Sequence, residues 1–102
     1  MQFEFTEEAD SMFQVYVLRS RKTARRYVGS CEDLDDRVRR HNAGESKATK
    51  HGVPWAVIHN ERFSTRAEAT RRERYYKTGR GRDELDRIEA AMKFPNAQCT
   101  SA

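Results

Sequence analysis

Two short runs near the start of the chain alternate hydrophobic and polar residues in the way that β-strands do. The first run covers residues 13–18 and the second covers residues 27–29, with a polar stretch between them that suits a hairpin loop. Neighbouring side chains of a strand point to opposite faces, so a core-facing Val15 sends Tyr16 to the other face. The same argument applies to Tyr27. The pattern therefore predicts two paired strands with a tyrosine on one face of each, in a register that the sequence leaves open.

A helix is predicted next. Leu34, Val38 and His41 recur at the spacing of one helical face, and the helix should end near residues 42–44, Asn-Ala-Gly. Arg37 lies at the edge of the same face, four residues before His41. Because side chains four apart are neighbours on a helix, Arg37 and His41 can reach the same side of the sheet.

A loop and a third strand follow this helix. The loop over residues 45–52 is rich in small and basic residues. The strand is predicted over residues 55–62, and its alternation places Trp55, Val57 and His59 on one face. We expect Trp55 to belong to the core.

Two further helices complete the chain. Residues 65–68, Thr-Arg-Ala-Glu, have the form of a capping box that begins a helix, and Gly79 should end it. Asp83 can cap the last helix. The buried side of that helix is marked by Leu85, Ile88 and Met92. The element order is therefore strand, strand, helix, strand, helix, helix, which predicts a small α+β domain.

Glu73 requires an explanation, because it shares a helical face with Ala69 and Tyr76. A carboxylate on a packing face needs a partner, either a neighbouring arginine or a bound cation. From spacing alone, an ion pair with Arg71, Arg72 or an arginine from elsewhere is favoured.

The distribution of charge adds a candidate partner. Residues 1–11 contain four acidic and no basic residues, whereas residues 12–102 hold all 20 Lys and Arg but only 12 Asp and Glu. Fifteen of the 20 are arginines, whose planar guanidinium suits phosphate. This pattern is typical of a nucleic-acid-binding protein, although a solvated, arginine-rich surface explains the charge equally well.

The sequence also excludes some classes of protein. It has no run near the roughly 20 apolar residues of a membrane span, and its first residues lack the features of a signal peptide. We therefore expect a cytoplasmic protein with no membrane partner, and the oligomeric state stays open. Cys31 and Cys99 lack metal-binding spacing and should be free thiols. We expect a flexible acidic leader over residues 1–11, one domain over residues 12–94 and a flexible tail over residues 95–102.

The motifs together resemble a known family. The residues that carry the resemblance are Gln14-Val15-Tyr16, Tyr27-Val28-Gly29, Arg37, His41-Asn42 and Glu73, in this order. They resemble the GIY-YIG nuclease superfamily, with Gln-Val-Tyr in place of Gly-Ile-Tyr. The stretch 67–82 is similar to small stand-alone bacterial members related to the N-terminal nuclease domain of the bacterial excision-repair endonuclease. The resemblance covers roughly residues 12–92.

This resemblance implies a fold and an activity. The fold would be a three-stranded antiparallel sheet flanked by helices. The activity would be metal-dependent hydrolysis of nucleic-acid phosphodiester bonds, with DNA preferred to RNA, in DNA repair or on unusual DNA structures. Glu73 would be the sole protein ligand of one Mg²⁺ or Mn²⁺, with water and phosphate oxygens completing an octahedral shell. That implication replaces the ion pair favoured by spacing alone.

The resemblance also implies roles for individual residues. Tyr27 would take a proton from the attacking water, which a phenol can do near neutral pH only beside positive charge. Tyr16 would orient the water, and Arg37 would stabilise the charge of the transition state. His41 would tune Tyr27 or relay its proton, and Gly29 would allow close approach of a bound strand. The basic residues expected to contact nucleic acid are Lys47, Lys50, Arg80 and Arg82.

Two other functions remain open. Many family members carry an asparagine about a dozen residues after the metal-binding glutamate, where this chain has Leu85 and the next asparagine is Asn96. The first alternative is therefore a nucleic-acid-binding module with this fold and little or no turnover. The second is a protein-interaction domain with a basic surface. The intact Tyr16, Tyr27, Arg37 and Glu73 favour catalysis, because a simple binder needs only the basic surface.

Overall fold

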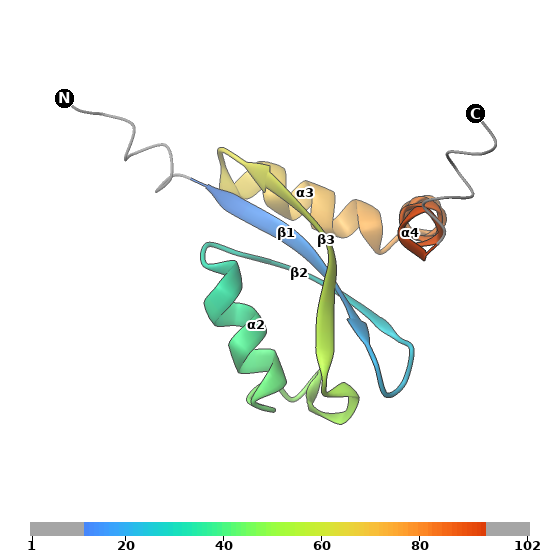
Figure 1. The fold of residues 1–102 in the computed structure, drawn as a ribbon. Coiled ribbons are helices and arrows are strands. Elements are labelled where there is room, and N and C mark those ends of the chain that lie inside the picture. Colours follow the sequence, from blue (N-terminus) through green and yellow to red (C-terminus); the bar gives the residue numbers. More distant parts are fainter. Residues whose placement is uncertain (1–11, 94–102) are drawn as a thin grey trace.

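The computed structural model describes residues 12–93, so the expected leader, the expected tail and Cys99 lie outside the described residues. The elements in chain order are β1 (Phe13–Ser20), β2 (Arg26–Cys31), α2 (Leu34–Asn42), the 3-10 helix η1 (Lys50–Gly52), β3 (Trp55–Phe63), α3 (Arg66–Tyr76) and α4 (Gly79–Lys93) (Figure 1). This order confirms the predicted α+β architecture. No helix within residues 12–93 has the length and apolar character needed to cross a membrane.

The sheet is antiparallel, and its strand order is β2-β1-β3. The central residues of β1, 15–18, are buried because helices cover both faces: α2 lies against one, and α3 and α4 lie against the other (Figure 1). Tyr16 pairs with Gly29 and Leu18 pairs with Tyr27, which places both tyrosines on the α2 face. The prediction that they share a face is confirmed. β2 lies at one edge of the sheet, and the residues of the candidate active site surround it.

Each face of the sheet has its own hydrophobic cluster. On the α3 and α4 side the buried residues are Val15, Val17, Val28, Ala69, Tyr76 and Leu85. On the α2 side they are Tyr16, Leu18, Cys31 and Trp55, with Tyr27, Leu34 and Val38 packed against them. Trp55 is thus a core residue, as predicted, and Cys31 is a buried free thiol. Because packed side chains have little freedom, these clusters hold the tyrosine rings in fixed positions.

A β-bulge in β3 corrects one prediction. Val17 pairs with His59, but the next residue of β1, Leu18, pairs with Val57, so one extra residue of β3 stands between the two pairs. Such a bulge changes the phase of the alternation. Val57 follows Leu18 to the α2 face, whereas the ring of His59 meets the edge of the buried Tyr76 ring on the opposite face. The prediction that Val57 and His59 share a face is therefore wrong.

The start of α3 is confirmed, and the buried side of α4 is confirmed in part. Thr65 Oγ1 accepts a hydrogen bond from the Glu68 amide at 3.2 Å, and the Glu68 carboxylate accepts one from the Thr65 amide at 3.3 Å, which is the predicted capping box. In α4, Leu85 is buried and Ile88 packs against the core. Met92, however, is 51% exposed because it lies in the last turn, beyond the residues that pack on the sheet.

The junction between α3 and α4 differs from the prediction. α3 ends at Tyr76 instead of continuing to Gly79, and α4 begins at Gly79 instead of after Asp83. The Thr78 hydroxyl accepts a hydrogen bond from the Gly81 amide at 3.1 Å, so Thr78 performs the capping expected of Asp83. A Cβ atom on Gly81 would lie 2.0 Å from a carbonyl oxygen of α3, so only glycine allows this close junction.

Arg72 is an internal link between three elements. Its Nε donates to Glu61 of β3 at 2.9 Å, and its Nη2 donates to Glu84 of α4 at 3.0 Å. Burial acts to raise the pKa of Glu61, but hydrogen bonds, first of all the one from Arg72, outweigh it and hold that pKa below its usual value. Arg72 therefore joins α3 to β3 and α4, and it is not a partner of Glu73.

Candidate active site

A buried chain of hydrogen bonds runs from β1 to the loop after α2. The Tyr16 hydroxyl lies 3.0 Å from Nε2 of His41, and Nδ1 of His41 lies 2.8 Å from Oγ1 of Thr49. All three side chains are buried. Burial, aided by the neighbouring Tyr27, raises the pKa of Tyr16, and burial together with the Arg37 charge lowers the pKa of His41. A neutral phenol and a neutral imidazole fit a chain in which Tyr16 donates to Nε2 and Nδ1–H donates to Thr49.

Tyr27 lies beside this chain but is only half-buried. Its ring centroid is 5.0 Å from that of His41 and 6.2 Å from that of Tyr16. It also lines a cavity of about 230 Å³ together with Arg37 and His41. Of the two phenols, Tyr27 is therefore the one that an incoming water or phosphate can reach.

Arg37 is placed by α2 as the helical spacing predicted. It is exposed, one turn before His41, and its guanidinium reaches the cavity that Tyr27 lines. Within residues 12–93 the structure gives it no ion-pair partner, in contrast to Arg39 and Arg40, which both pair with Asp36. A cation without a carboxylate partner beside a half-buried phenol is available to a phosphate.

Glu73 reaches β2 from the opposite face. Its Oε1 accepts a hydrogen bond from the Ser30 hydroxyl at 2.9 Å, and its Oε2 forms an ion pair with Lys77 Nζ at 2.9 Å. Ser30 follows Gly29 in β2, so its side chain points to the α3 face. Glu73 is thus paired as spacing suggested, but with Lys77 in place of the expected arginines.

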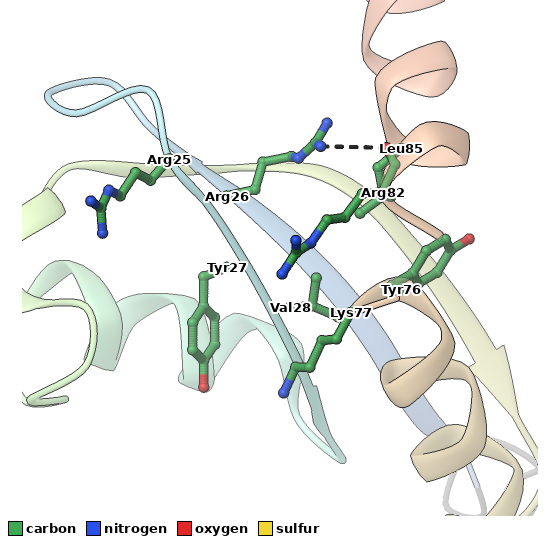
Figure 2. Close-up of a pocket in the computed structure, with 8 residues that line it drawn as sticks. All are labelled: Arg25, Arg26, Tyr27, Val28, Tyr76, Lys77, Arg82 and Leu85. Atoms are coloured by element: carbon green, nitrogen blue, oxygen red, sulfur yellow. Dashed lines mark hydrogen bonds between the residues drawn. The ribbon is translucent and has the colours of Figure 1, made fainter. Parts of the chain in front are cut away.

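Tyr27 on the α2 face and the Glu73–Lys77 pair on the α3 face both lie beside β2, which is an edge strand of the sheet. A second cavity, of about 400 Å³, is lined by Tyr27 on one side of β2 and by Lys77 on the other. Figure 2 shows both side chains extending in the same direction beside this strand. Tyr27 and the ion pair of Lys77 with Glu73 therefore lie at one strand edge, although they belong to opposite faces.

The donor atoms at this edge can be compared with the needs of a divalent cation. No group of three His, Cys, Asp or Glu side chains within residues 12–93 could enclose a metal ion. Glu73 provides one carboxylate, whose side chain is 23% exposed, with oxygens held by a hydroxyl and by an ammonium that is itself 54% exposed. Mg²⁺ is commonly bound by one or two carboxylates and keeps several waters. The site fits such a cation if Lys77 releases its oxygen.

Gly29 allows a close packing contact that the sequence did not predict. A Cβ atom at this position would lie 2.6 Å from the hydroxyl oxygen of Tyr16 and 3.0 Å from the ring of Tyr27. The phenol of Tyr16 therefore lies directly over the bare backbone of Gly29, its partner in the sheet. Gly29 thus allows the close approach of Tyr16, and the close approach of a bound strand stays a prediction.

Substitution of Gly29 should disturb the site more than the fold. We expect Gly29→Ala to push the Tyr16 ring away from His41, to lower the free energy of unfolding by about 1–3 kcal/mol, as overpacking does, and to reduce any activity of the site. Gly79→Ala is the control, since nothing lies within 4 Å of a Cβ at that position. Urea denaturation of both variants measures the difference, and equal stabilities would contradict the contact.

The basic residues expected to bind nucleic acid are all exposed, but they lie in two places. Lys47 lies in the loop after α2, and Lys50 begins η1. Arg80 and Arg82 lie in the first turn of α4, and only Arg82 among these four lines the cavity shared by Tyr27 and Lys77. The structure does not bring the four together.

Three contacting residues were missed by the sequence analysis. Lys77 stands four residues after Glu73, a spacing that predicts an ion pair and could have been used. Ser30 follows Gly29 directly, but a serine in a strand gives no signal of its own. Thr49 lies in an irregular loop, and its contact with His41 depends on how that loop folds back.

Comparison with known proteins adds a family. The model of the GIY-YIG catalytic domain matches residues 12–86. A "UPF0213 protein" of Staphylococcus haemolyticus is 34% identical over 76 residues, which cover 74% of this chain and 92% of the relative. Others, from Haloquadratum walsbyi and Listeria welshimeri, are 43% identical over 53 residues and 46% identical over 52 residues; these cover 51% and 50% of this chain and 60% and 58% of the relatives. No solved structure gives a significant match.

Proposed function

Because the chain belongs to the GIY-YIG family, we propose that it is a metal-dependent endonuclease that hydrolyses phosphodiester bonds of nucleic acid, with DNA preferred to RNA. We further propose that it acts in DNA repair or on unusual DNA structures. The cytoplasmic location expected from the sequence stays a prediction. The names of the relatives state no activity, so these points rest on the site.

The observation that carries the proposal is the meeting of an accessible phenol and a carboxylate at one exposed strand edge. Tyr27 of β2 lies on the α2 face with the buried Tyr16 of β1 beside it, and Glu73 approaches β2 from the α3 face through Ser30. Packing alone does not require a half-buried carboxylate and a half-buried phenol at the same edge. A phosphodiester lying along β2 would meet Tyr27 and Glu73, whereas Tyr16, at 1% exposure, stays behind the surface.

The side chains divide the chemistry among them. Tyr27, the accessible phenol, releases its proton to solvent and then takes the proton of the attacking water, while the water oxygen bonds to phosphorus, one ester P–O bond breaks and the leaving oxygen takes a proton from solvent. Arg37 supplies positive charge beside Tyr27 and to the non-bridging oxygens in the transition state. Tyr16 keeps its proton and is positioned by His41, so it orients groups by hydrogen bonding and is not a base.

Glu73 is the residue that would hold Mg²⁺ or Mn²⁺. Ser30 holds one of its oxygens and Lys77 balances its charge; a cation bound at Glu73 would replace Lys77 on the other oxygen. A bound divalent cation supplies positive charge next to the scissile phosphate. Loss of the Lys77 ion pair would cost little, because an ion pair as exposed as this one contributes about 1 kcal/mol or less to the free energy of unfolding.

One observation favours the alternative of a binding module with little turnover. Leu85 is 1% exposed and belongs to the core, at the position where many family members have an asparagine. A buried leucine cannot contact phosphate through a polar group. If that contact is essential, nucleic acid would be bound but not cut.

Purified protein incubated with labelled nucleic acids tests the proposal. The panel contains single-stranded, duplex and branched DNA and the matching RNA, each with Mg²⁺, with Mn²⁺ or with EDTA. We expect cleavage of DNA with either cation and none with EDTA, because the cation completes the site. Binding without cleavage under all conditions would support the alternative. Absence of both binding and cleavage would exclude nucleic acid as the partner.

A further inference from the structure

The cavity of about 400 Å³ beside β2 is larger than the part of the site assigned so far. It lies between β2, the end of α3 and the first two turns of α4 (Figure 2). Val28, Tyr76 and Leu85, which are buried members of the core, form its floor. Cavities of this size commonly hold small organic ligands, and an apolar floor suits a sugar or base better than an isolated ion.

The rim of the cavity is positive. Arg25, Lys77 and Arg82 line it; Figure 2 shows Lys77 and Arg82 extending toward β2, and Arg25 extending away from both. Neither Arg25 nor Arg82 has a carboxylate partner for its guanidinium within the part of the chain that the structure describes, and both are exposed. Two cations, Lys77 and Arg82, beside an apolar floor match the two halves of a nucleotide, which is an anionic phosphate joined to a less polar sugar and base.

Arg26 shows the contrasting arrangement. Although it also lines the cavity, its guanidinium pairs with Glu89 at 3.0 Å and with Asp86 at 2.8 Å. These bonds fasten α4 to the sheet, and Figure 2 shows the side chain turned toward α4. The charge of Arg26 is thus already paired with carboxylates of α4, whereas Arg25 and Arg82 can bind an anion.

We infer that this cavity binds one nucleotide of the bound strand, next to the nucleotide at the scissile bond. Lys77 and Arg82 hold its phosphate, and its sugar or base lies against Val28 and the half-buried ring of Tyr27. The adjacency follows from two shared residues: Tyr27 lines the cavity, and Lys77 also pairs with Glu73. The inference rests on the proposed function, because it takes the strand to lie along β2.

Leu85 closes the floor of the cavity from within the core. The cations of the rim supply the polar contacts that the missing asparagine cannot make. The cavity would therefore fix the strand by one whole nucleotide and not by a phosphate alone.

Nuclear magnetic resonance of the full chain labelled with ¹⁵N tests the site directly. Thymidine 5′-monophosphate, inorganic phosphate and thymidine are titrated separately in EDTA, so that cleavage plays no part. We expect the monophosphate to shift the amide signals of Val28, Lys77 and Arg82 at lower concentration than either other probe. Equal effects of the monophosphate and inorganic phosphate, or shifts confined to other regions, would overturn the inference.

Charge reversal then tests the cavity on a strand. In EDTA, Arg82→Glu should weaken binding of a labelled oligonucleotide by about tenfold, the effect of losing one charge-assisted contact, and Arg25→Glu, whose side chain extends away from Arg82, should weaken it less. Arg87→Glu, which changes the same charge at another exposed position of α4, should weaken it far less. Melting temperatures confirm that all three variants fold. Equal losses for all three would mean a diffuse electrostatic effect and would overturn the inference.

These results separate the inference from the proposed function. If the unmodified protein cuts DNA but Arg82→Glu binds the oligonucleotide as well as Arg87→Glu, the inferred nucleotide site is wrong, whereas the proposed nuclease activity is supported. If the unmodified protein neither binds nor cuts nucleic acid, both are wrong.

Discussion

Glu73→Gln should abolish cleavage and leave a folded protein that still binds nucleic acid. The amide keeps the size of the side chain and can still accept the hydrogen bond from Ser30, but it removes the charge that would hold a divalent cation. We expect a loss of at least about 100-fold in cleavage rate, as for other groups that supply transition-state electrostatics. The free energy of unfolding should change by no more than about 1 kcal/mol, since only a partly exposed ion pair with Lys77 is lost.

The measurement combines cleavage, melting temperature and oligonucleotide binding on the same preparation. Glu68→Gln is the matched control, because it removes the same charge from an exposed position of the same helix, and glutamine can also serve in the capping box. Cation binding by Glu73→Gln, followed through the paramagnetism of Mn²⁺, should weaken, whereas Glu68→Gln should bind Mn²⁺ as the unmodified protein does. A folded Glu73→Gln protein that cuts at the unmodified rate would show that Glu73 only pairs with Lys77.

Arg37→Ala should have an effect of similar size on cleavage and almost none on stability. The guanidinium is exposed and lies in the cavity that Tyr27 lines, so its removal takes away charge from the reacting phosphate without opening the core. We expect cleavage to fall by about 100-fold and the melting temperature to stay within error. Arg37→Lys keeps the charge without the planar fork and should recover part of the rate.

Arg39→Ala provides the control for this prediction. Arg39 lies on the same helix and is exposed, but it pairs with Asp36 and does not line the cavity. It should cut at nearly the unmodified rate. Equal rates for Arg37→Ala and Arg39→Ala would remove Arg37 from the site.

The sequence predicted best those features that depend on local periodicity. Alternation placed Tyr16 and Tyr27 on one face, and helical spacing placed His41 and Arg37 beside them. The capping box at Thr65 was also visible, because both of its hydrogen bonds lie within four residues. Such features need no knowledge of how distant segments meet.

The features that were missed depend on tertiary contacts. The bulge that turns His59 to the other face is a property of the pairing between β1 and β3, and a single strand sequence does not contain it. The contact of His41 with Thr49 requires a loop to fold back. Asp83 has a suitable side chain for a cap, but Gly81 allows α4 to start beside α3, and Thr78 then takes that position.

Placing the site at an edge strand restricts how this sheet can associate with other chains. The outer side of β2 carries backbone amide and carbonyl groups without a strand partner among residues 12–93, and such groups pair readily with a strand from another molecule. A strand added there would occupy the space beside Tyr27, Ser30 and Glu73 that a substrate needs. Self-assembly through β2 and access of nucleic acid would therefore be mutually exclusive, so that a filament or dimer formed through this edge would be an inactive form of the protein.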